Sequence, residues 1–146
     1  MSSHVLVVQA NEGRDLGGVI CKVRSEATNG QYSILELRLA PGQGAPPHIH
    51  HREDEIFTIL EGECAITAQE KTQTAKAGAV VILPRGVAHA FRNTSDVPTR
   101  IMITAVPGGL ETFFEESSQV AADDPEANTK LTAIAQRYQI EFLKNA

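Results

Sequence analysis

Three histidines and three acidic residues lie close together at positions 48–55, within the segment PPHIHHREDEIFTILEG (46–62). His48 and His50 are separated by one residue, so on an extended backbone both imidazole rings point to the same face. Two imidazoles on one face can bind a single metal ion, because neutral imidazole is the commonest metal ligand in proteins. A solvated loop has a similar composition, so the metal interpretation needs further ligands from elsewhere in the chain.

Glu55 is the next candidate ligand, and its position requires a bend in the chain. It lies an odd number of residues after His50, so a continuous strand would direct the two side chains to opposite faces. A polar tetrad between them can form such a bend, and we expect it to be solvated, with one member supporting a metal ligand from outside. The tetrad is His51, Arg52, Glu53 and Asp54.

A fourth candidate, His89, follows the turn Pro84-Arg85-Gly86 in an apolar stretch. Taken alone, a histidine there is more typical of a core residue that is hydrogen-bonded to the backbone. The case for a ligand depends on the wider spacing of the residues around it.

The spacing defines two long motifs. In the first, Gly42, His48, His50, Glu55 and Gly62 are separated by five, one, four and six residues.

The second motif runs Gly78, Pro84, Gly86, His89 and Asn93, with five, one, two and three residues between them. Fifteen residues separate the two motifs.

These motifs resemble the two signature motifs of the cupin superfamily, and they match at every defining position. The resemblance spans roughly residues 32–106, and the C-terminal part is similar to the tail of small single-domain cupins that include quercetinase-like proteins. It implies an all-β fold, a double-stranded β-helix or jelly-roll barrel with a C-terminal α-helix packed outside. It also implies one domain over residues 1–146, with a barrel core at about 18–106 and a helical tail at about 109–144.

The same resemblance implies that His48, His50, Glu55 and His89 bind one divalent transition metal per chain. Iron, manganese, nickel, cobalt, copper and zinc all suit this ligand set, which does not choose among them. Among the motif residues, Gly62 and Gly86 would occupy tight turns. Asn93 would stabilise the barrel through hydrogen bonds.

Short apolar runs separated by turn residues agree with a closed or two-layered β structure. Strands are expected at 4–8, 19–23, 32–39, 55–60, 63–68, 79–83, 88–92 and 100–106. One or two helical turns are expected at 109–117, followed by a helix that begins with Asp124 as N-cap and Pro125. The apolar face of that helix would comprise Ala127, Leu131, Ile134, Tyr138 and Phe142.

Side-chain alternation also predicts an apolar substrate pocket. Phe57 and Ile59 share the parity of Glu55, and Phe91 shares that of His89, so all three should face the barrel interior. Three arginines could pair with a substrate carboxylate, although surface positions are the more ordinary interpretation of each. They are Arg38, Arg85 and Arg92.

Composition narrows the possible partners and location. The net charge is −5 among 146 residues, which argues against binding to nucleic acid through bulk electrostatics. No apolar run approaches the roughly 20 residues of a membrane span, and the first residues do not resemble a signal peptide, so a cytoplasmic location is expected. Cys21 and Cys64 form no CxxC pair and are expected to be buried thiols.

These features favour a metal-dependent dioxygenase. The substrate would be a small enol, phenol, flavonol-like molecule or β-dicarbonyl, and Glu55 would alternate between metal ligand and catalytic base. Two alternatives remain open: a Lewis-acid isomerase, decarboxylase or lyase that uses no oxygen, and a non-catalytic small-molecule-binding cupin. A homodimer is expected, formed through the N-terminal strands 4–8 and 19–23, because a sheet edge can pair with another chain.

Overall fold

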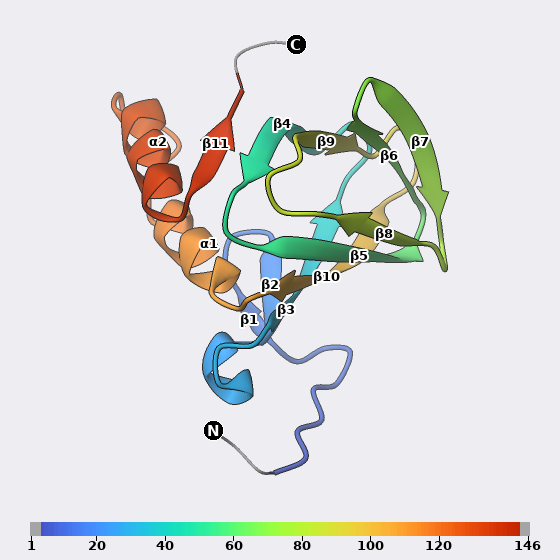
Figure 1. The fold of residues 1–146 in the computed structure, drawn as a ribbon, viewed down its shortest axis with the longest axis horizontal. Helices are drawn as coiled ribbons and strands as arrows, with labels where there is room; N and C mark the ends of the chain where they lie inside the picture. The colour runs from blue at the N-terminus through green and yellow to red at the C-terminus, as the bar shows by residue number, and fades with distance from the viewer. Residues whose placement is uncertain (1–3, 144–146) are drawn as a thin grey trace.

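A computed structural model describes residues 4–143, and its core is formed by two facing antiparallel sheets (Figure 1). The six-stranded sheet has the order β1-β2-β3-β10-β5-β8, and the five-stranded sheet has the order β11-β4-β9-β6-β7. This is the all-β jelly roll that the resemblance of the two motifs implies. The strands are β1 (Arg14–Asp15), β2 (Val19–Val23), β3 (Ser33–Leu39), β4 (Gly44–His50), β5 (Asp54–Glu61), β6 (Glu63–Ala68), β7 (Lys71–Lys76), β8 (Val80–Leu83), β9 (His89–Arg92), β10 (Thr99–Val106) and β11 (Ile140–Phe142).

Alternating residues of the strands fill the space between the sheets. On β10, Ile101, Ile103 and Ala105 are buried while the intervening side chains are only partly covered. On the neighbouring β5, Phe57 and Ile59 are buried in the same way. Period-two patterning therefore gives each strand one apolar face, and the two sheets bury these faces against each other.

Two helices lie outside the barrel, on the side where β11 joins β4 (Figure 1). They are α1 (Leu110–Ser118) and α2 (Ala127–Arg137), and a short 3₁₀ helix, η1 (Ser25–Thr28), precedes β3. The buried carboxylate of Glu111 accepts hydrogen bonds from the backbone N–H groups of Ser25 (2.7 Å) and Gly109 (3.1 Å), which fixes the start of α1. None of the helices within residues 4–143 combines the length and apolar character needed to cross a bilayer.

Seven of the eight expected strands and the helix at 109–117 are confirmed, with boundaries shifted by at most one residue. The strand expected at 4–8 is wrong: these residues have no regular secondary structure, and Val5 is 93% exposed. High β-propensity is insufficient there, because no neighbouring strand supplies hydrogen bonds. The described cysteines, Cys21 and Cys64, are both buried free thiols, as predicted.

Two longer strands were not expected from the sequence. Strand β4 contains Pro46 and Pro47, which usually argue against a paired strand, but they lie where the β4–β9 register shifts between Ala45 and His48. Strand β7 reads KTQTAK and lies at the edge of its sheet, so only Ala75 is buried and the apolar signal is weak.

The prediction of a helix continuing to Phe142 is wrong. Helix α2 ends at Arg137, Gln139 adopts a positive φ of 57°, and the chain then pairs with β4 as β11. Asp124 does not serve as N-cap: its carboxylate accepts a hydrogen bond from the N–H of Glu126 (2.8 Å), one turn before the helix. The tail boundary expected at residue 144 lies outside the described residues.

The motif residues outside the ligand set hold the turns. Asn93 Nδ2 donates to the carbonyls of Leu39 (3.1 Å) and Val97 (2.7 Å), and its N–H donates to Gln43 (2.8 Å). Pro84 and Gly86 form the turn before β9, where the Gly86 N–H donates to the carbonyl of His50 (2.9 Å). Four motif glycines have positive φ: Gly42, Gly62, Gly78 and Gly86.

Gly62, which connects β5 to β6, lies in close contact with the start of β10. A Cβ atom there would lie 2.6 Å from the Pro98 carbonyl oxygen and 2.6 Å from Thr99 Oγ1, whereas a Cβ at Gly78 meets nothing within 4 Å. Both residues have positive φ, so Gly62→Ala and Gly78→Ala share the backbone strain, but only the former adds a clash. We expect Gly62→Ala to destabilise the fold by about 1–3 kcal/mol more than Gly78→Ala in urea denaturation. Equal destabilisation would contradict this packing.

Candidate metal centre

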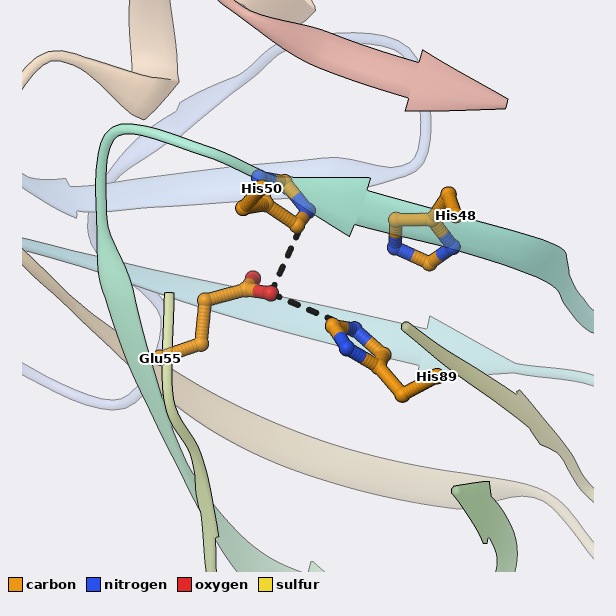
Figure 2. A group of neighbouring side chains, drawn as sticks. All are labelled: His48, His50, Glu55 and His89. Atoms are coloured by element: carbon orange, nitrogen blue, oxygen red, sulfur yellow. Dashed lines mark ion pairs between the residues drawn. The ribbon is translucent and has the colours of Figure 1, made fainter. Parts of the chain in front are cut away.

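Three strands bring the candidate ligands together inside the barrel. His48 and His50 lie on β4, Glu55 lies near the start of β5, and His89 is the first residue of β9, paired directly with His48. Figure 2 shows the four side chains pointing toward a common centre. All four are at least 94% buried, so the centre is screened from solvent.

The ligand atoms have the spacing of a metal site. One atom from each of the four residues lies within 4.8 Å of the others. Glu55 Oε1 lies 3.2 Å from His50 Nε2 and 3.5 Å from His89 Nε2, as the dashed lines in Figure 2 mark. The cluster can therefore hold one metal ion with three imidazole nitrogens and one carboxylate oxygen.

Each imidazole is oriented by an acceptor on its outer nitrogen. Nδ1 of His48 lies 2.7 Å from the Pro46 carbonyl oxygen, and Nδ1 of His89 lies 3.3 Å from that of Val87. Nδ1 of His50 lies 2.8 Å from Glu53 Oε1. A carbonyl or carboxylate oxygen only accepts, so Nδ1 carries the proton in each ring and the Nε2 lone pair is available for a metal.

Two buried ligand atoms that face the centre lack hydrogen-bond partners among the described residues. Within residues 4–143, neither Glu55 Oε1 nor His89 Nε2 has a hydrogen-bond partner, although both are buried. An unpartnered buried carboxylate oxygen is costly, and a divalent cation would satisfy both atoms at once. The donor set, the geometry and these orphaned atoms all fit a transition metal.

The protonation states also suit a metal. Burial lowers the pKa of His48 to about 4, so this ring is neutral at pH 7. Burial would raise the pKa of Glu55, but the His89 imidazole and the charge of His50 hold it below its usual value, so the carboxylate is ionised. Burial opposes protonation of His50 as well, yet the hydrogen bond with Glu53 and the charge of Glu55 raise its pKa.

The bend between β4 and β5 is present, and it is less solvated than expected. His51 is exposed, and its Nε2 lies 2.9 Å from Glu141 Oε1 on β11. Glu53, however, is 1% exposed, which corrects the expectation of a fully solvated tetrad. It is buried because its carboxylate turns inward to His50, and so it is the tetrad member that supports a ligand.

A cavity of about 200 Å³ opens next to His48, His50 and Glu55. The structure places Phe57 and Phe91 in its wall, as side-chain parity indicates, but Ile59 packs in the core and does not line the cavity. Its other apolar lining residues are Leu37, Leu39, Ala45, Ile103, Phe113, Phe114, Ile140 and Phe142.

The three arginines considered as partners of a substrate carboxylate either pair with other carboxylates or are exposed at the surface. Arg38 Nε donates to Glu36 Oε2 (2.7 Å), and Arg85 pairs with Asp54 (3.1 Å). Arg92 is exposed. Within residues 4–143, none of the three lines the cavity.

Sequence reasoning missed the cavity residues of the C-terminal segment, residues 110–142. Phe113 and Phe114 were expected on a helix of no assigned role, and Phe142 on the wrong element. The available signal was composition: the chain has five phenylalanines and no tryptophan, and two of the five are adjacent.

Comparison with known proteins identifies the family. Residues 35–105 match the family model described as "Cupin domain", and this match contains all four clustered ligands. The chain belongs to the cupin superfamily. Among solved structures, this cupin superimposes on a Thermotoga maritima protein described as a predicted oxalate decarboxylase. That match has a TM-score of 0.63 at 24% identity and covers 70% of this chain and 99% of the other, which supports the fold alone.

Curated relatives of this cupin include germin-like proteins of plants. Germin-like protein subfamily 2 member 2 of Arabidopsis thaliana is 37% identical over 75 residues, covering 48% of this chain and 34% of the relative. Germin-like protein 5-1 of rice is 31% identical over 106 residues, covering 66% of this chain and 48% of the relative. The chain thus spans between a third and a half of the length of these relatives.

Removing a single ligand tests the centre. We expect His50→Ala or His89→Ala to reduce bound metal from about one equivalent to near zero, measured by elemental analysis after dialysis. His51→Ala is the matched control, because His51 is adjacent but exposed and does not face the centre. Full metal retention in both ligand variants would contradict the site.

Proposed function

We propose that this cupin is a metal-dependent dioxygenase that acts on a small enol, phenol or β-dicarbonyl compound. The observation that carries the proposal is a buried cluster of three histidines and one glutamate that opens onto a mostly apolar cavity. Four protein ligands leave coordination positions open on metals that accept five or six, which suits an oxygen-bearing substrate.

The residues of the site would have different roles in this reaction. His48, His50 and His89 would hold the metal through Nε2, each kept in orientation by its Nδ1 hydrogen bond. The bound metal would supply Lewis acidity, and redox chemistry if it is iron, manganese, nickel, cobalt or copper. Glu55 is ionised at neutral pH, so its carboxylate can accept the proton that a substrate hydroxyl loses on binding.

The apolar wall of the cavity also supports the proposed reaction. Phe57 and Phe91 contact each other edge to face, with ring centroids 5.3 Å apart, and exclude water beside the ligands. A dioxygenase inserts both atoms of O₂ into its substrate, so the substrate itself supplies the electrons and no external reductant is needed.

Oxygen consumption tests the proposal directly. We expect protein reconstituted separately with each of the six metals to consume one O₂ per product molecule with at least one phenol or enol. A Clark electrode and mass spectrometry of ¹⁸O-labelled product would measure this, with His89→Ala as the inactive control. Product formed equally fast without oxygen would indicate Lewis-acid chemistry, and tight binding without any product would indicate a binding protein.

We also propose a homodimer. Support comes from the N-terminal segment, where Val5, Leu6 and Val7 are consecutive and all more than 60% exposed. A contiguous exposed apolar segment is typical of an interaction surface.

Sedimentation equilibrium tests the association. We expect a mass of about twice the 15.7 kDa of one chain at micromolar concentration, and dissociation in Val5→Asp/Val7→Asp. Val80→Asp/Ile82→Asp, on exposed positions of β8, is the control that should leave the mass unchanged. A wild-type mass near that of one chain would overturn the dimer.

A further inference from the structure

All five phenylalanines of the chain line the one cavity at the metal centre. They come from four separate elements, so their convergence is a property of the fold and not of one sequence motif. They are Phe57 on β5, Phe91 on β9, Phe113 and Phe114 on α1, and Phe142 on β11.

The C-terminal segment supplies the outer wall of this cavity. In the β11–β4 pairing, Phe142 lies opposite His48 and Ile140 lies opposite His50, so the strand sets apolar side chains directly beside two ligands. The rings of Phe142 and His48 have centroids 5.8 Å apart. On α1, Phe113 contacts both Phe114 and Tyr138 edge to face, which ties the helix wall to the end of α2.

This outer wall is not part of the matched cupin domain. The family match ends at residue 105, whereas α1, α2 and β11 follow it. The segment also contributes no metal ligand. The ligands therefore come from the matched barrel, and part of the shape and polarity of the cavity comes from a segment outside the matched domain.

Away from the metal ligands, the described part of the chain places no cationic side chain in the cavity wall. Of the described residues that line it, none is a lysine or arginine, and the only ionisable ones are His48, His50 and Glu55. Oxalate could chelate the metal through one oxygen of each carboxylate, but its two outer oxygens would then carry negative charge against phenylalanine rings without a partner, which is costly. A ring with neutral substituents has no such cost and can stack edge to face on the wall.

The size of the cavity sets a further limit. Its volume of about 200 Å³ is below the roughly 300–1,000 Å³ of sites for drug-sized ligands. A single aromatic ring with two adjacent oxygens fits this limit, whereas a three-ring flavonol exceeds it.

We propose that the metal-centre cavity selects a compact, uncharged, single-ring aromatic molecule with adjacent oxygen substituents, and that residues 110–142 impose this selection. The inference deepens the proposed function and shares its dependence on the metal site. It concerns recognition, however, and can be tested without turnover.

The test is a binding comparison in the absence of oxygen. Protein loaded with Co(II) would be titrated with catechol and with oxalate, and the change in the visible cobalt spectrum would report the Kd. We expect catechol to bind at least tenfold more tightly than oxalate. Tighter binding of oxalate would overturn the proposal.

A charge placed in the wall should reverse the preference. Phe142 is 49% exposed at the cavity, so Phe142→Arg can be accommodated and would present a guanidinium beside His48. We expect it to weaken catechol at least tenfold and strengthen oxalate at least tenfold. The control Val80→Arg adds the same charge at an exposed position of β8 outside the cavity and should change neither.

A milder variant guards against misfolding. Phe142→Leu keeps the wall apolar but removes the ring, and we expect it to weaken catechol severalfold with no gain for oxalate. Unchanged affinities in Phe142→Leu and in Phe142→Arg, with cobalt retained, would overturn the role of the segment.

Catechol binding without O₂ uptake would contradict the dioxygenase and leave this inference standing. O₂ uptake with a β-dicarbonyl compound, without any binding of catechol, would do the reverse.

Discussion

One buried charge organises this protein. The carboxylate of Glu55 lies inside an apolar barrel among three imidazoles, and its Oε1 has no hydrogen-bond partner among residues 4–143. A buried carboxylate oxygen without a hydrogen-bond partner is costly, and a cation held among the imidazoles would offset that cost. The strand pairing that sets His89 against His48, and the outer hydrogen bonds that fix each ring, serve to keep nitrogen lone pairs on the same point.

The polar centre and its apolar surroundings arise from the same alternation. Along β5, every second residue faces inward, so Glu55, Phe57 and Ile59 are successive positions of one face. The first of these reaches the metal centre, the second lines the cavity, and the third is in the core. One face of β5 therefore supplies a ligand, a cavity residue and a core residue, in order of increasing distance from the metal centre. The regular alternation of side chains along the strand is sufficient for this.

The sequence identified what depends on local spacing and missed what depends on partners. The four ligands were predictable because the two motifs resemble those of the cupin family, which implies a role for each position. Most strands were predictable because their apolar runs are short and bounded by turns. Residues 4–8 have the composition of a strand but lack a neighbour, whereas β7 has a neighbour but little apolar content. Phe142 kept helical spacing with Tyr138, yet its pairing with His48 as a strand could be known only from the three-dimensional contact.

The bend at residues 51–54 links two requirements of the site in one short connection. It reverses the parity of the chain, which brings Glu55 to the histidine face, and it carries Glu53, which holds His50. Adding or removing one residue there would turn Glu55 outward and move Glu53 away from its imidazole together. Surface connections in a barrel ordinarily tolerate changes of length. Here a change of one residue would reverse which face of β5 points inward, so the ligand cluster sets the length of the connection.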